Sequence, residues 1–81
     1  MRHIFGKGFV ERLENLPKET QQKFWKQLGF LVSDLRHPSL HAKKYDEAKG
    51  IWQARVDRSY RFYFLIDEDI YILLDIRGHP K

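Results

Sequence analysis

The sequence contains no cysteine. A disulfide framework, a thiolate metal site and a thiol nucleophile are therefore excluded. Long hydrophobic runs are also lacking, because the longest unbroken apolar segments are residues 62–66 and 70–74. A membrane-spanning helix needs roughly 20 apolar residues, and the core of a signal peptide needs ~7–15. We therefore predict a cytoplasmic protein that neither spans a membrane nor carries an evident export signal.

The chain has 81 residues, of which 42% are hydrophobic and 15% aromatic. This apolar content excludes a disordered chain. A chain of this length buries only about 60–65% of the surface that its unfolded form exposes, so it needs nearly all of its apolar residues for one core. We therefore expect residues 1–81 to form a single domain.

The chain carries 15 Lys and Arg residues against 11 Asp and Glu residues, a formal net charge of +4. Residues 36–61 hold seven of the basic residues and three of the acidic ones, so the excess positive charge is concentrated there. Such a concentration is typical of proteins that bind a polyanion, although an ordinary soluble surface also carries it.

The first half of the chain has helical periodicity. Apolar residues recur at helical spacing from Phe24 to Leu35. Pro17 suits the first turn of such a helix, and Pro38 bars helix at the residue before it. We therefore predict a helix from about Pro17 to about Arg36. Two shorter elements are predicted upstream, a strand and a helix: Arg2–Phe5 and Gly8–Asn15.

The second half changes to the alternating pattern of strands. Gly50–Asp57, Tyr60–Asp67 and Asp69–Ile76 are rich in β-branched and aromatic residues and are joined by short turns. Connections this short make neighbouring strands antiparallel. Two helices followed by such strands predict an α+β fold with both helices on one face of the sheet.

Alternation along these strands assigns each side chain to a face. The face toward the helices is predicted to hold Trp52, Ala54, Val56, Phe62, Phe64, Ile66, Ile70, Ile72, Leu74 and Ile76. The opposite, open face is predicted to hold Gln53, Arg55, Arg61, Tyr63, Asp75, Arg77 and His79. The same alternation places Tyr71 and Leu73 on this side. Arginine, tyrosine and histidine gathered on one uncovered face are typical of a phosphate or RNA site.

Several segments in order resemble the RelE/ParE toxin superfamily of bacterial type II toxin–antitoxin systems. The resemblance covers essentially the whole chain and implies a pair of N-terminal helices on an antiparallel sheet. The segments that carry it are 37–40 (HPSL), 43–44 (KK), 50–56 (GIWQARV), 60–62 (YRF) and 78–79 (GH).

The resemblance implies a toxin that is neutralised by a cognate antitoxin protein and needs no cofactor or metal. The RelE branch, the mRNA interferases, cleaves mRNA on the ribosome. The resemblance to this branch implies that Arg55 and Arg61 act on the scissile phosphate and that His79 transfers a proton. The residues expected to contact RNA are Lys43, Lys44, Gln53 and Arg77. Two features depart from the nuclease pattern: Gln53 stands where some nucleases carry lysine, and the tail ends at Pro80 and Lys81 without a tyrosine.

The resemblance leaves other functions open. The ParE branch poisons DNA gyrase instead of cutting RNA, and a catalytically degenerate toxin would retain only antitoxin or RNA binding.

Each candidate residue also has a simpler role. Arg61 would pair with Asp57 or Asp75, Arg55 would be a solvated strand residue, and His79 would be a frayed chain end. Both Lys43 and Lys44 would be solvated loop residues. Trp25 and Trp52 are expected in the core. His37 and His41 are four residues apart, but Pro38 argues against a helix that would align them as metal ligands.

Overall fold

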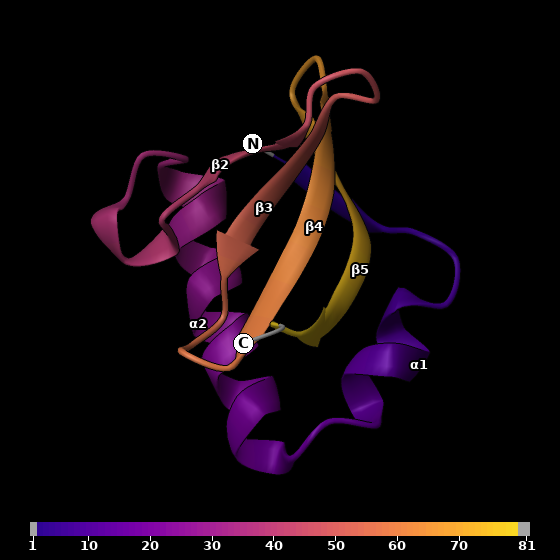
Figure 1. The fold of residues 1–81 in the computed structure, drawn as a ribbon, viewed down its shortest axis with the longest axis vertical. Coiled ribbons are helices and arrows are strands. Elements are labelled where there is room, and N and C mark those ends of the chain that lie inside the picture. Colours follow the sequence, from indigo (N-terminus) through magenta and orange to yellow (C-terminus); the bar gives the residue numbers. More distant parts are fainter. Residues whose placement is uncertain (1, 80–81) are drawn as a thin grey trace.

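The computed structural model describes residues 2–79. Helices and strands are connected as in Figure 1, where colour follows the sequence. The elements in chain order are β1 (Arg2–Phe5), α1 (Phe9–Glu14), α2 (Lys18–Ser33), the short 3₁₀ helix η1 (Pro38–Leu40), β2 (Lys43–Asp46), β3 (Ile51–Arg55), β4 (Tyr60–Asp67) and β5 (Ile70–Gly78). Within residues 2–79, no helix is both long and apolar enough to cross a bilayer.

The five strands form one sheet in the order β1-β5-β4-β3-β2. β1 runs parallel to β5, and the other neighbours are antiparallel. The predicted α+β class, the strand over Arg2–Phe5 and the β3–β4–β5 meander are confirmed. The expectation of a loop at Lys43 and Lys44 is wrong, because both lie in β2 at the edge of the sheet. β2 has only four residues and no clear alternation of apolar residues. It is therefore a strand because it pairs with β3, and the sequence alone does not indicate it.

The long helix ends earlier than predicted. α2 stops at Ser33 and Asp34 takes an extended conformation. The Asp34 carboxylate then accepts a hydrogen bond from the backbone N–H of Arg36 at 2.9 Å. Such a local side-chain bond offers the backbone an alternative to the helix, which explains the early end.

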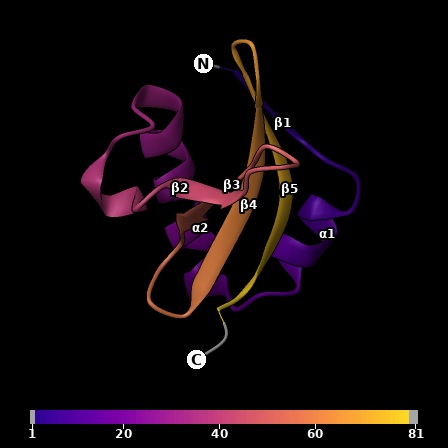
Figure 2. The ribbon, with the colours of Figure 1, turned by 45° about the horizontal axis from the view of Figure 1, so that its top comes forward.

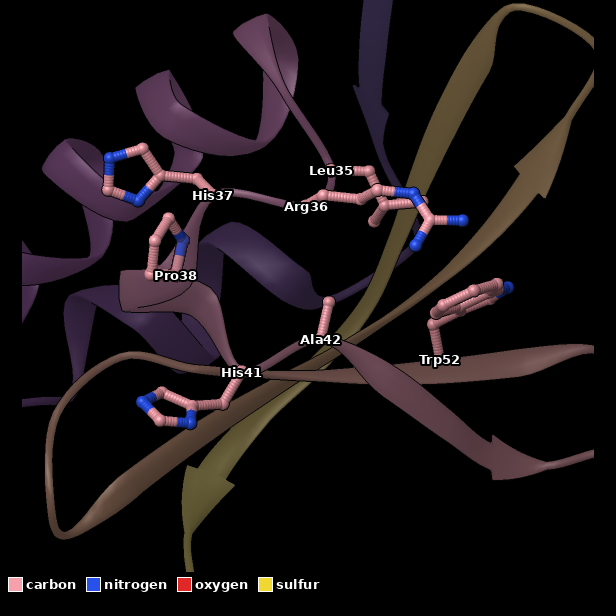
Figure 3. A pocket seen from close by; sticks show the side chains of 7 residues that line it. All are labelled: Leu35, Arg36, His37, Pro38, His41, Ala42 and Trp52. Carbon is pink, nitrogen blue, oxygen red and sulfur yellow. The ribbon is translucent and has the colours of Figure 1, made fainter.

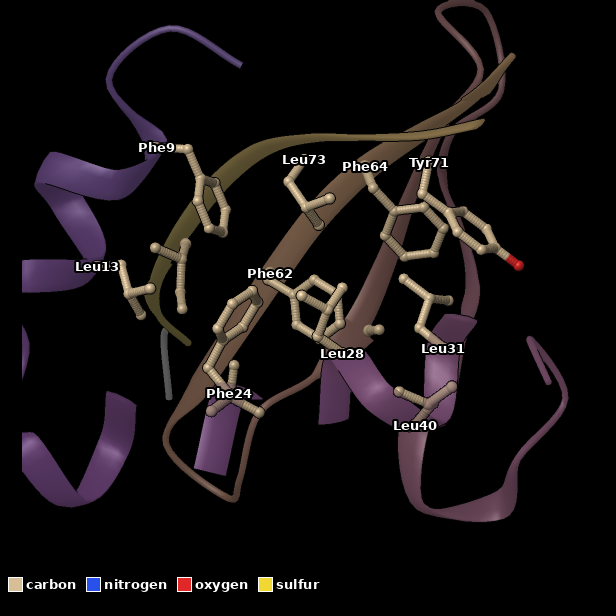
Figure 4. Packing of buried hydrophobic residues seen from close by; sticks show 13 residues of the cluster. Phe9, Leu13, Phe24, Leu28, Leu31, Leu40, Phe62, Phe64, Tyr71 and Leu73 are labelled. Atoms are coloured by element: carbon tan, nitrogen blue, oxygen red, sulfur yellow. The ribbon is translucent and has the colours of Figure 1, made fainter. Parts of the chain in front are cut away.

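Both helices cover the same face of the sheet, with α1 beside β5 and α2 on the side of β2 (Figures 1 and 2). Their apolar residues interdigitate with those of the central strands (Figure 4). The rings of Phe24 on α2 and Phe62 on β4 meet edge to face at 5.3 Å. The buried core comprises Phe9, Leu13, Phe24, Leu28, Leu31, Leu40, Ala54, Val56, Phe62, Phe64, Tyr71, Leu73 and Ile76.

A β-bulge in β5 overturns part of the predicted face assignment. Tyr63 pairs with Asp75, but the next residue, Phe64, pairs with Leu73, so Leu74 is an extra residue. A bulge resets the alternation of side chains. Tyr71 and Leu73 therefore lie in the core, whereas the alternation had placed both on the opposite side of the sheet. The expected core residues Ile70, Ile72 and Leu74 are only partly buried, and Ile76 is buried as predicted.

Trp25 was expected in the core and is instead 48% exposed. It follows Phe24 on α2 and lies at the flank of the buried helical face. Its ring meets Phe5 of β1 edge to face at 5.9 Å. The short β1 at the sheet edge gives it no further cover.

Candidate functional site

Three arginines stand side by side on neighbouring strands. Arg55 of β3 pairs with Arg61 of β4, and Arg61 pairs with Arg77 of β5. Residues directly opposite one another share a face of the sheet, and like charges so placed repel. The open face therefore carries an arginine row, Arg55–Arg61–Arg77, as the alternation predicted. The arrangement therefore favours an anionic ligand, whose charge would offset this repulsion.

Arg61 is held by the backbone. Its side chain is only 8% exposed, and Nη1 donates to the carbonyl oxygens of Asp57 at 2.6 Å and Tyr60 at 3.0 Å. Burial, together with the adjacent Arg55, lowers the pKa of Arg61. Arginine nevertheless remains charged at neutral pH.

Within residues 2–79, Arg61 forms no ion pair with Asp57 or Asp75, which was the simpler role considered for it. The Asp57 carboxylate instead accepts the backbone N–H groups of Ser59 at 2.8 Å and Tyr60 at 2.9 Å. It therefore shapes the β3–β4 turn whose carbonyls hold Arg61.

Arg55 presents an unsatisfied donor. Its Nε is buried and, within the described part of the chain, has no hydrogen-bond partner. Buried polar groups almost always have partners, so an orphan donor on the residue next to the Arg61 cation suits an anionic ligand. Its backbone is fixed, because Gln27 Nε2 of α2 donates to the Arg55 carbonyl at 2.8 Å. Gln27 also joins Ser39 of η1, donating to its carbonyl at 3.0 Å and accepting its hydroxyl at 2.7 Å.

Arg77 lies over an aromatic ring. Its guanidinium carbon is 4.7 Å from the centre of the Tyr63 ring, and Nη2 donates to the Tyr45 hydroxyl at 3.3 Å. Its Nε is 3.8 Å from a carboxylate oxygen of Asp75. Asp75 is shared with Arg12 of α1 at 2.8 Å. Arg77 thus has several contacts that hold its position although it is exposed.

Beside Arg55 and Arg61 is a pocket of about 480 Å³, the arginine pocket. Both His41 and His79 line it. The backbone N–H of His79 donates to the Ser59 carbonyl at 2.7 Å, which ties this end to the β3–β4 turn. The full lining is His41, Ala42, Lys43, Gln53, Arg55, Arg61 and His79.

His41 is the residue that sequence reasoning missed. Its spacing from His37 was considered only for metal binding, and within residues 2–79 no group of three or more potential ligands is placed to hold a metal ion. His41 follows η1 with a left-handed backbone, φ 47°. The path of the chain between α2 and β2 brings it to the pocket, and no local pattern predicts that path.

The adjacent residues Lys43 and Lys44 lie on opposite faces of the sheet. Lys43 pairs with Gln53 and lines the arginine pocket. Lys44 pairs with Trp52, and its Nζ lies 5.3 Å from the centre of the Trp52 ring. Lys44 therefore lies on the other face of the sheet, away from the arginine row. Of the predicted site residues, only Lys44 is not brought to the open face.

Two further pockets adjoin the arginine pocket. The Trp52 pocket, about 270 Å³, lies between Trp52 and the segment from Leu35 to Pro38 (Figure 3), and it shares His41 and Ala42 with the arginine pocket. The Tyr45 pocket, about 390 Å³, shares Gln53 and His79 with it. The Tyr45 pocket is lined by Tyr45, Gln53, Tyr63, Arg77, Gly78 and His79.

The fold matches solved toxin structures, whereas no protein-family model and no curated protein sequence matches the chain. RelE in the archaeal RelE–RelB complex from Pyrococcus horikoshii OT3 is 18% identical, with a TM-score of 0.79 over 95% of this chain and 92% of that one. YafQ from E. coli strain BL21(DE3) is 13% identical, with a TM-score of 0.78 over 98% and 94%. A YoeB/ParE toxin from Agrobacterium tumefaciens is 12% identical, with a TM-score of 0.79 over 99% and 100%. The chain therefore has the fold of the RelE/ParE toxin superfamily.

Proposed function

We propose that this protein is the toxin of a type II toxin–antitoxin system and that it cleaves mRNA on the ribosome without a metal ion. The observation that carries the proposal is the arginine row with two histidines in one pocket on the open face. A row of cations suits a phosphodiester, and imidazole suits proton transfer near neutral pH. The fold shared with RelE, YafQ and YoeB supports the same reading.

The proposed reaction is an internal transfer at phosphorus. A base removes the proton of the 2′-hydroxyl, and the 2′-oxygen attacks the adjacent phosphorus. The bond to the 5′-oxygen breaks, and an acid donates a proton to that leaving oxygen. The products are a 2′,3′-cyclic phosphate and a 5′-hydroxyl, so atoms and protons balance without a metal or cofactor.

The arginine pocket supplies a group for each step. His41 and His79 act as the base and acid, a contribution of ~10²–10⁴-fold. Arg61 stabilises charge on the phosphorane, because its guanidinium forks onto two oxygens and is already held in place. The orphan Nε of Arg55 donates to the same phosphate. Lys43, Gln53 and Arg77 bind the flanking RNA backbone.

An antitoxin is the proposed protein partner. RelE of Pyrococcus horikoshii was crystallised with RelB, and YoeB of Staphylococcus aureus with YefM. We infer that a cognate antitoxin binds and neutralises this chain and that the toxin acts in the cytoplasm as a single domain.

Cell-free translation tests the proposal. Wild-type protein is expected to stop translation and to produce cuts in the mRNA that primer extension maps, whereas Arg61→Ala and His79→Ala are expected to lose both effects. Arg2→Ala is the matched control, because Arg2 is exposed on β1 and its ion pair is with Asp69. Intact mRNA with wild-type protein would contradict the proposal. Accumulation of cleaved plasmid in a parallel gyrase assay would select the ParE-like activity instead.

A further inference from the structure

Arg12 is a residue of α1 that reaches β5, beside which this helix lies (Figure 1). Its Nη2 donates to the carbonyl of Leu74 at 2.7 Å, and its Nε lies 2.8 Å from a carboxylate oxygen of Asp75. Leu74 is the extra residue of the β5 bulge. A Cβ added at Gly8 would lie 2.8 Å from Arg12 Nη1, so the missing side chain there leaves room for the guanidinium. Arg12 therefore grips β5 at its bulge.

Asp75 lies between two guanidinium groups and is unequally shared by them. Its Oδ1 is 2.8 Å from Arg12 Nε and accepts the backbone N–H of Ile76 at 2.8 Å. Its Oδ2 is 3.8 Å from Arg77 Nε. The shorter distance is that of a charge-assisted hydrogen bond, and the longer one exceeds hydrogen-bond range. The carboxylate is therefore bound to Arg12 and attracts Arg77 only weakly.

This unequal sharing leaves the charge of Arg77 available. One carboxylate cannot neutralise two guanidinium groups, so Arg12, Asp75 and Arg77 together keep a net positive charge. Without Arg12, the Asp75 carboxylate could pair with Arg77 alone, and that pair would carry no net charge toward a phosphate. The arginine pocket and the Tyr45 pocket are lined by residues from His41 onward, so Arg12 acts from outside both.

We propose that Arg12 is a positioning residue that keeps Arg77 available to RNA by holding Asp75 away from it. The inference rests on the proposed function and gives α1 a role in it. Arg12 binds the carboxylate of Asp75 and does not bind RNA. Exposed ion pairs between side chains are weak, so we expect the loss of Arg12 to weaken RNA binding by about 2- to 5-fold.

The test measures the affinity for a labelled single-stranded RNA by fluorescence anisotropy. It is done without ribosomes and at low salt, where screening is weakest. Arg12→Ala is made in the wild-type protein, in Arg77→Ala and in Asp75→Asn. We expect it to weaken binding only in the wild-type protein. In Arg77→Ala the cation through which Arg12 acts is gone, and in Asp75→Asn the competing negative charge is gone.

The control is the exposed ion pair of Arg2 and Asp69, which lies at the other end of β5 with a distance of 3.5 Å. Arg2→Ala is expected to keep the wild-type affinity, both alone and combined with Asp69→Asn.

Three results would overturn the inference. Wild-type affinity of Arg12→Ala would show that Asp75 does not compete for Arg77. A loss that persists in Arg77→Ala or in Asp75→Asn would show that Arg12 contacts RNA, adds only general charge or supports the fold. Absence of RNA binding by the wild-type protein would leave Arg77 with no role to protect. Cleavage of mRNA by the wild-type protein in cell-free translation decides separately whether the proposed function stands.

Discussion

At the scale of single residues, the support of Arg61 is what distinguishes this site from a patch of surface charge. A buried guanidinium usually has a carboxylate partner, and here two backbone carbonyls take that role. The carbonyls neutralise no charge, so the cation remains available to an anion. The carboxylate of Asp57 is already used by the backbone of the turn.

This support predicts that lysine cannot replace Arg61. A lysine ammonium lacks the planar fork that holds the carbonyls and a phosphate at once. We expect Arg61→Lys to slow cleavage by ~10²–10³-fold, as loss of one stabilising donor does. Primer extension gives the rate, and thermal unfolding checks the fold. Arg2→Lys is the matched control, and a wild-type rate for Arg61→Lys would show that only its charge is needed.

Tyr71 predicts how stability depends on pH. Burial, and then the nearby Asp34 charge, raise the pKa of Tyr71 in the folded protein. The folded state therefore keeps this proton at a pH where the unfolded state loses it, and the free energy of unfolding falls as pH rises above about 10. We expect Tyr71→Phe to reduce this alkaline fall in urea titrations from pH 8 to 11. An equal fall in wild-type and Tyr71→Phe protein would contradict the assignment.

At the scale of elements, alternation predicted faces wherever a strand runs without a bulge. Alternation placed Arg55 and Arg61 on the open face correctly, because β3 and β4 pair there without a register shift. Tyr71 was placed on the wrong face because the bulge at Leu74 lies between it and Asp75. A bulge of one residue leaves no signal in the hydrophobic pattern of an apolar strand, so the faces of residues 70–74 were not predictable.

The link made by Gln27 is an element-scale feature with a measurable role. Gln27 joins α2 to η1 and to the end of β3, so it fixes the segments that carry His41 and Arg55. Gln27→Ala leaves two partly buried carbonyls without this donor. We expect it to lower the free energy of unfolding by about 1–3 kcal/mol and to slow cleavage. Urea titration measures the first effect and primer extension the second.

The control for Gln27 is Gln22→Ala on the same helix, where the side chain is exposed. We expect Gln22→Ala to change stability by less than about 0.5 kcal/mol. If the two variants were equally stable, the link between the three elements would have no energetic role.

At the scale of the whole molecule, the excess of positive charge in the middle of the chain predicted a basic surface. It did not predict which basic residues lie on which face of the sheet. Lys43 faces the arginine pocket while Lys44 packs on Trp52. The pairing of the edge strand β2 with β3 decides this, and it brings Lys43 and Tyr45 of this loop-like segment to the open face. His41 reaches the same pocket through tertiary packing alone.

The clustering of cations predicts a salt-dependent interaction with RNA. Each phosphate that a side chain neutralises on a single strand contributes about −0.7 to the slope of log affinity against log salt concentration. We expect Arg77→Ala to make this slope shallower by about 0.7, measured by fluorescence anisotropy with single-stranded RNA. Arg2→Ala should keep the wild-type slope. An affinity of the wild-type protein that does not change with salt would exclude backbone binding by the arginine row.

The most direct measurement is the chemistry of the RNA ends produced during translation. If the arginine row and its two histidines cut RNA by attack of the 2′-hydroxyl, wild-type fragments carry a 2′,3′-cyclic phosphate or its hydrolysis product on one side and a 5′-hydroxyl on the other. A 2′-deoxynucleotide at a mapped site then blocks the cut there, and Arg61→Ala yields no fragments above background. Fragments with 5′-phosphate ends, or cuts that persist at the 2′-deoxynucleotide, would contradict the account.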